Sequence, residues 1–117
     1  MNKVFLIGRL AKDVELRRTQ SNKAVASFTL AVDRRKKDAG ADFIPCVAWE
    51  GTAEAASRYL AKGSKCAVSG WISTRTYEKN GERRYVTEIT ADEIEFLDPR
   101  NKEEYPIETG EDQTLPF

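Results

Sequence analysis

The 117-residue chain contains no histidine, only two cysteines and one methionine, and its 19 basic and 19 acidic side chains leave no net charge. The absence of histidine excludes Ser-His-Asp and Cys-His catalysis and any histidine general base. Without histidine, Cys46 and Cys66 cannot make a metal-ligand cluster, and we expect both thiols to be buried and reduced. A Gly-rich phosphate loop is also missing. We therefore expect neither an enzyme nor a bound metal or cofactor.

Long apolar runs are absent as well, since none approaches the roughly 18 residues of a membrane span. The first three residues lead directly into a strand-like segment, without the apolar region of a signal peptide. The length suits one domain followed by a tail. We expect a soluble cytoplasmic protein that has no membrane partner.

The zero net charge conceals a basic body and an acidic tail. Residues 1–97 hold 17 of the 19 basic and 13 of the 19 acidic side chains, whereas residues 98–117 hold two basic and six acidic ones. Few apolar groups and excess negative charge predict that this tail is disordered. It ends on Leu115, Pro116 and Phe117, shortly after Glu111 and Asp112. An apolar tip on an acidic tether predicts a segment that another protein binds.

Patterns of apolar residues predict five strands and one helix. The strands are expected at residues 4–10, 25–32, 42–49, 65–77 and 83–96, and the helix at residues 53–62 with Thr52 as N-cap and Gly63 as stop. Asn80-Gly81 predicts a hairpin turn between the last two strands. A helix between the third and fourth of five strands is the order of an OB-fold, a Greek-key barrel, so residues 1–97 are expected to form an all-β domain.

Alternation within these segments also assigns their buried faces. In the third and fourth strands and the helix, the residues expected in the core are Ile44, Cys46, Ala48, Cys66, Val68, Gly70, Ile72, Ala55, Ala56, Tyr59 and Leu60.

Aromatic side chains gather on the opposite faces of the third and fourth strands. Phe43 and Trp49 share that face of the third strand, and Trp71, Arg75 and Tyr77 share that of the fourth. Basic residues surround them, mostly at loop tips: Arg34, Arg35, Lys36, Lys37, Lys79, Arg83 and Arg84. Unpaired bases stack on aromatic rings while Lys and Arg neutralise phosphates, so the pattern predicts binding of single strands with little sequence preference. Trp71, in mid-strand, also suits a subunit contact.

Residues 2–10, 24–32, 41–49, 59–64 and 70–77, with the terminal Leu-Pro-Phe, together resemble the bacterial and phage single-stranded DNA-binding protein family. The resemblance implies a homotetramer of OB-folds that wraps single-stranded DNA during replication, recombination and repair. It also implies that the C-terminal tips recruit replication and repair proteins. The family's principal stacking aromatics map onto Phe43, Trp49 and Tyr77.

Two segments depart from the family pattern. The loop after the second strand carries Arg34-Arg35-Lys36-Lys37 where an aromatic is often found, which implies fewer stacked bases and more phosphate contacts. The tail has a short linker, and Gln113-Thr114 interrupts its acidic residues. Two other functions fit the same residues: an OB-fold replication accessory whose barrel mainly contacts proteins, and an RNA-binding OB protein. An OB-fold nuclease is opposed by the missing catalytic cluster.

Overall fold

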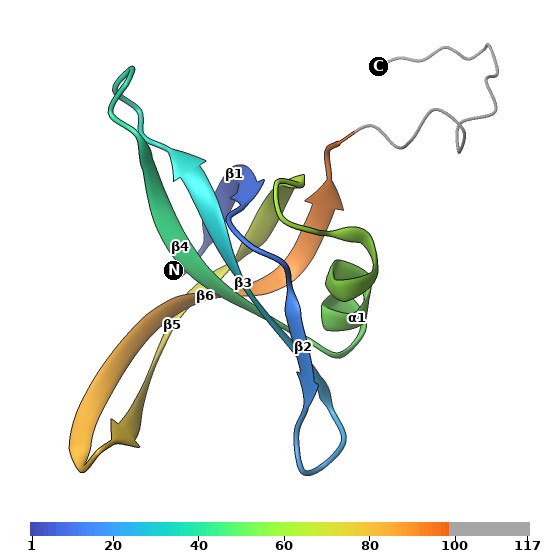
Figure 1. Cartoon of the computed structure of the whole chain (residues 1–117), viewed down its shortest axis with the longest axis vertical. Helices are drawn as coiled ribbons and strands as arrows, with labels where there is room; N and C mark the ends of the chain where they lie inside the picture. The colour runs from blue at the N-terminus through green and yellow to red at the C-terminus, as the bar shows by residue number, and fades with distance from the viewer. Residues whose placement is uncertain (99–117) are drawn as a thin grey trace, which may run out of the picture.

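The computed structural model of the chain describes residues 1–98 and consists mainly of strands (Figure 1). The elements, in chain order, are β1 (Val4–Leu10), β2 (Glu15–Arg18), β3 (Ala24–Asp33), β4 (Ala41–Trp49), α1 (Glu50–Tyr59), β5 (Lys65–Lys79) and β6 (Glu82–Phe96). All five predicted strands are present, with ends shifted by no more than two residues. The short β2 was not predicted, because its four residues are all exposed and carry no apolar alternation.

The strands form one sheet in the order β1-β5-β6-β4-β3-β2, which a further pairing between β1 and β3 closes into a barrel. The β4–β6 pair is parallel and the other pairs are antiparallel. β1 and β2 contact different parts of β3, so the two together occupy one place in a five-stranded closed barrel. This arrangement confirms the predicted OB-fold.

The core lies inside the barrel and under α1. Leu30, Ala48, Cys66 and Val68 are among its fully or almost fully buried members. Ile72, however, is 46% exposed, so its assignment to the core is wrong. Ile72 lies beyond Gly70, the last residue of β5 that pairs with β1, and β5 continues from there into the projecting hairpin with β6.

The helix α1 differs from its prediction at both ends. It begins three residues earlier, at Glu50, because β4 turns directly into it there with a positive φ of 54°. Trp49 is the N-cap and no side chain caps the helix, so the assignment of Thr52 as N-cap is wrong. The helix ends at Tyr59 rather than at residue 62. At ten residues it is too short to cross a bilayer, and no helix within residues 1–98 is long and apolar enough to do so.

The buried side of α1 is made by Ala53 and Ala56, with Leu60 directly after the helix. Ala55 is only half-buried, and Tyr59 is 52% exposed. The assignment of Tyr59 to the core is therefore wrong. Its ring instead packs at the surface against Phe96, with the two centroids 5.4 Å apart.

Three hairpins, β2–β3, β3–β4 and β5–β6, project from the barrel (Figure 1). At the tip of β5–β6, Asn80 and Gly81 have φ values of 54° and 80°, as the predicted two-residue turn requires. Gly70 lies at a register irregularity between β5 and β6, and a Cβ there would overlap the backbone carbonyl of Thr90. Only glycine lets β5 and β6 approach so closely where they leave the barrel.

Both cysteines are free and lie in the core, as expected from the sequence. Burial raises the pKa of the Cys46 thiol to about 12, with smaller contributions from the neighbouring Cys66 and Glu88. Burial also raises the pKa of Cys66 to about 11, with a contribution from Asp98. Both thiols are therefore neutral at physiological pH and are poor nucleophiles.

Candidate nucleic-acid interface

The outer face of β4, opposite the core, carries Phe43 and Trp49, as the alternation predicted. Pairing with β3 sets Phe43 beside Ala31 and Trp49 beside Val25. Phe43 is 65% exposed and Trp49 is 43% exposed. Both rings can therefore be reached from solvent, although Trp49 also covers part of the sheet.

The register between strands extends this face across the sheet. Trp71 on β5 lies opposite Thr90 on β6, and Thr90 lies opposite Val47 on β4. Directly opposed residues share a face, so Trp71 and, by alternation, Tyr77 lie on the same side as Phe43 and Trp49. We call this side, with its four exposed aromatics, the aromatic face. The four rings were predicted from the sequence, and the fold brings them to one side of the sheet.

A groove of about 390 Å³ runs along the aromatic face between the β2–β3 and β5–β6 hairpins. Its walls and floor are Arg17, Val25, Ser27, Val47, Trp49, Ser73, Thr74, Arg75, Glu88 and Thr90. Val25 and Val47 are buried, yet neither belongs to the core cluster inside the barrel. The groove thus combines an apolar floor with a tryptophan ring, hydroxyl groups and two arginines, which together fit a stacked base and its phosphate.

Arg75 and Arg17 are the basic residues of the groove. The Nε of Arg75 lies 3.1 Å from a carboxylate oxygen of Glu88, and the guanidinium lies 5.8 Å from the ring centroid of Tyr77. An Nη of Arg17 donates a hydrogen bond of 3.0 Å to the hydroxyl of Ser27. Arg17 was not predicted from the sequence, because its short strand is polar and only the pairing with β3 carries it to the groove.

The other predicted phosphate-binding residues lie at two hairpin tips. Arg34, Arg35, Lys36 and Lys37 are exposed in the β3–β4 turn, and Lys79, Arg83 and Arg84 are exposed at the end of β5–β6. Arg34 forms an ion pair with Asp42 at 3.0 Å, and Arg84 forms one with Glu82 at 3.2 Å. Such exposed pairs contribute little stability, so phosphate can replace these carboxylates at small cost. Within residues 1–98 the other five make no ion pair.

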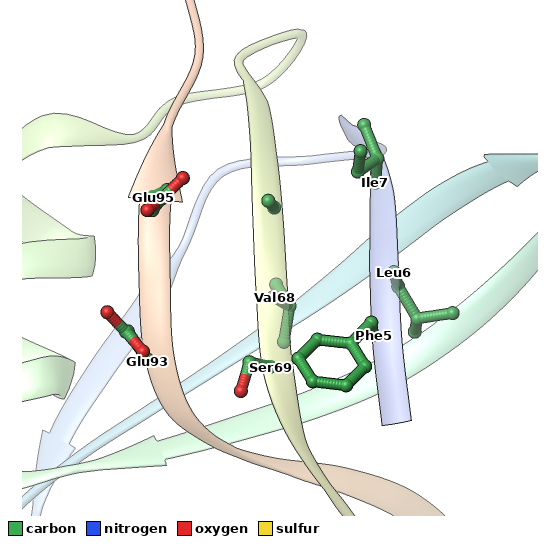
Figure 2. A pocket seen from close by; sticks show the side chains of 8 residues that line it. Phe5, Leu6, Ile7, Val68, Ser69, Glu93 and Glu95 are labelled. Carbon is green, nitrogen blue, oxygen red and sulfur yellow. The ribbon is translucent and has the colours of Figure 1, made fainter. Parts of the chain in front are cut away.

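A second hollow, of about 320 Å³, lies on the outer side of the sheet where β1, β5 and β6 meet (Figure 2). We call it the apolar hollow. Phe5 and Ile7 lie along its β1 side, Ala67 and Ser69 on β5, and Glu93 and Glu95 along β6. Phe5 is 72% exposed and Ile7 is 58% exposed. Phosphate is repelled by the two carboxylates, so this hollow suits a protein surface better than a nucleic acid.

Two further sequence predictions concern metals and the tail. Within residues 1–98 no group of three or more cysteine, aspartate or glutamate side chains is placed to hold a metal ion. The predicted partner-docking residues Glu111, Asp112, Leu115, Pro116 and Phe117 lie outside the described residues, as does nearly all of the segment predicted to be disordered.

Residues 1–97 match the single-strand binding protein family. "Single-stranded DNA-binding protein 3" of Clostridium acetobutylicum is 58% identical over 103 residues, covering 84% of this chain and 72% of the relative. "Single-stranded DNA-binding protein" of Clostridium tetani is 53% identical over 108 residues, covering 88% and 74%. "Single-stranded DNA-binding protein 2" of Listeria innocua is 50% identical over 109 residues, covering 89% and 69%.

Proposed function

The chain belongs to the single-strand binding protein family, and on this premise we propose that it binds single-stranded DNA along the aromatic face. Family membership confirms the resemblance noted in the sequence. It also supports a binding protein over an enzyme, since the relatives are named as DNA-binding proteins.

The observation that carries the proposal is the gathering of Phe43, Trp49 and Tyr77 on one side of the sheet, with basic hairpin tips beyond them. Aromatic side chains stack on any base, whereas the bases of a duplex are already stacked on one another. The face therefore favours single strands. Stacking and phosphate contacts carry no hydrogen-bond code, so binding is largely independent of sequence.

We propose that the protein coats single-stranded DNA in the cytoplasm during replication, recombination and repair. The test is anisotropy of a labelled oligothymidylate with unlabelled competitors. Single-stranded DNA of mixed sequence should displace the label, whereas duplex of the same length should not. Displacement by RNA as efficiently as by DNA would favour the RNA-binding alternative. An absence of binding would favour the accessory protein whose barrel contacts other proteins.

We further propose that the protein assembles as a homotetramer, using β1 and the apolar hollow. β1 pairs with β5 along most of its length, but lies against β3 only from Gly8 to Leu10, so the other edge of residues 4–7 is open. Open strand edges pair readily with another strand. Beside this edge, Phe5 and Ile7 leave more apolar surface exposed than a monomeric domain of this size needs.

Light scattering tests the assembly. The parent protein should have the mass of four chains at micromolar concentration, and Ile7→Glu should lower it, because a carboxylate beside Glu95 disfavours burial of the hollow. A monomeric parent across the micromolar range would contradict the proposal. An unchanged mass for folded Ile7→Glu would place the contact elsewhere.

The last part of the proposal divides the chain into a DNA-binding domain, residues 1–97, and an acidic tail, residues 98–117, whose tip recruits replication and repair proteins. Its support is the sequence: an apolar tip and carboxylates suit a pocket that pairs apolar slots with basic residues. Removal of residues 115–117 should abolish binding of such proteins while DNA affinity stays equal or rises slightly. Equal capture of the same identified proteins with and without the tip would contradict it.

A further inference from the structure

Trp71 lies between the two hollows of the sheet and belongs to neither. Its neighbours two residues away on the same strand face are Ser69, which lines the apolar hollow, and Ser73, which lines the groove. The indole is 40% exposed. Beside it, the hydroxyls of Ser73 and Thr90 lie 2.8 Å apart at the edge of the groove. Trp71 therefore continues the aromatic face beyond the end of the groove.

The start of the chain brings a cation to this place. Val4 pairs with Gly70. Two residues earlier, the side chain of Asn2 donates to the carbonyl of Ile72 at 2.8 Å and accepts from its N–H at 2.9 Å. Extended by one residue beyond the Val4–Gly70 pair, the same antiparallel register sets Lys3 opposite Trp71, on the same face of the sheet.

Charge changes sign along this outer surface. The ammonium of Lys3 lies 5.4 Å from the ring centroid of Phe5, at the Trp71 end of the apolar hollow. The far side of the hollow carries Glu93 and Glu95 (Figure 2). The Ser69 hydroxyl donates a hydrogen bond of 3.1 Å to a carboxylate oxygen of Asp92. A nucleic acid leaving the groove thus meets an aromatic ring and a cation first, and carboxylates beyond them.

We propose that Trp71 and Lys3 form a second contact for single-stranded DNA, reached only by a strand long enough to extend out of the groove. This inference rests on the proposed function. A base stacks on the indole, and Lys3 neutralises an adjacent phosphate. A second copy of the chain seated on the apolar hollow would cover Phe5 and Ile7, whereas Trp71 lies outside the hollow and stays accessible to DNA.

The chain offers a direct test because it contains only two tryptophans. Trp49→Phe leaves Trp71 as the only indole, and Trp71→Phe leaves Trp49. Each variant is titrated with an oligothymidylate of about five nucleotides, near the lower limit for one OB-fold, and with one of about thirty. Circular dichroism verifies that both variants are folded.

Both oligothymidylates should quench the fluorescence of Trp49, whereas only the longer one should quench the fluorescence of Trp71. Trp71→Ala should weaken binding of the longer strand by about fivefold or more, the loss of one stacked base, and leave the shorter one unaffected. Lys3→Ala should lower the salt dependence for the longer strand alone.

Four results would overturn the inference. If Trp49 is quenched while Trp71 responds to neither length, the proposed function stands and the second contact fails. Equal quenching of Trp71 by both strands would make it part of the groove site. If the fluorescence emission of Trp71 shifts with protein concentration and does not change when DNA is added, Trp71 belongs to a subunit contact. If neither tryptophan responds, the proposed function itself fails.

Discussion

Replacing Phe43 by alanine tests the stacking role of the aromatic face most cleanly, because this ring is 65% exposed and contributes little to folding. About a third of its roughly 200 Å² is buried, so at about 25 cal/mol/Å² the loss in free energy of unfolding stays below about 2 kcal/mol. The loss of one stacked base is worth about 1–3 kcal/mol, which raises the Kd for single-stranded DNA about 5- to 150-fold. The loss of binding should therefore be measurable in a variant that remains folded.

Tyr85 provides the matched control. It is 77% exposed and lies opposite Thr76, whereas Tyr77 lies opposite Arg84, so Tyr85 occupies the other face of the same hairpin. Tyr85→Ala removes a ring of similar size without touching the aromatic face. In an oligothymidylate titration, Tyr85→Ala should bind like the parent. Parental affinity for a folded Phe43→Ala, or an equal loss in both variants, would refute the stacking argument.

Alanine at residues 35–37 should lower the slope of log Kd against log salt by about 2, since each lost phosphate contact contributes about 0.7 for a single strand; an unchanged slope would place the β3–β4 hairpin away from the DNA. The free energy of unfolding should be highest below about pH 9 and fall above it. The unfolded chain loses its thiol protons there, whereas Cys46 and Cys66 keep theirs in the folded protein because their pKa values are about 12 and about 11. The fall relative to a double Cys→Ala variant should reach about 3 kcal/mol by about pH 10 in urea unfolding, and parallel pH profiles would contradict it. Gly70→Ala should lower the free energy of unfolding by about 2 kcal/mol or more, because the added Cβ would overlap the Thr90 carbonyl. If the variant unfolds at the same urea concentration as the parent, β5 and β6 can separate at this position and the prediction is wrong.

Much of the fold could be predicted because the chain alternates wherever one face of a strand is buried. Cys46 and Ala48 pointed inward and Phe43 and Trp49 outward, as that alternation requires, and Asn80-Gly81 marked a turn that needs two positive φ values. The same regularity selected the four aromatics that share one face. Burial of alternate residues depends only on residues close together in the chain, so it can be recognised in the sequence.

The remaining features depend on pairing between strands, which local alternation does not encode. Arg17 reaches the groove only because β2 pairs with β3. Ile72 is exposed because β5 continues beyond its pairing with β1. The start of the chain reaches Trp71 through the register of β1 on β5, which pairs Val4 with Gly70 across more than 60 residues of sequence. The helix ends were misplaced for a related reason, since the direct turn from β4 into α1 replaces a side-chain cap.

The central claim is that bases stack on the aromatic face, and photocrosslinking tests it most directly. An oligothymidylate carrying 5-iododeoxyuridine is irradiated in complex with the full chain, and the crosslinked peptides are sequenced by mass spectrometry. Crosslinks are expected at Phe43, Trp49 and Tyr77, and none at Tyr85 on the opposite face of the hairpin. Crosslinks confined to Tyr85, or to Tyr59 and Phe96 beside α1, would contradict it.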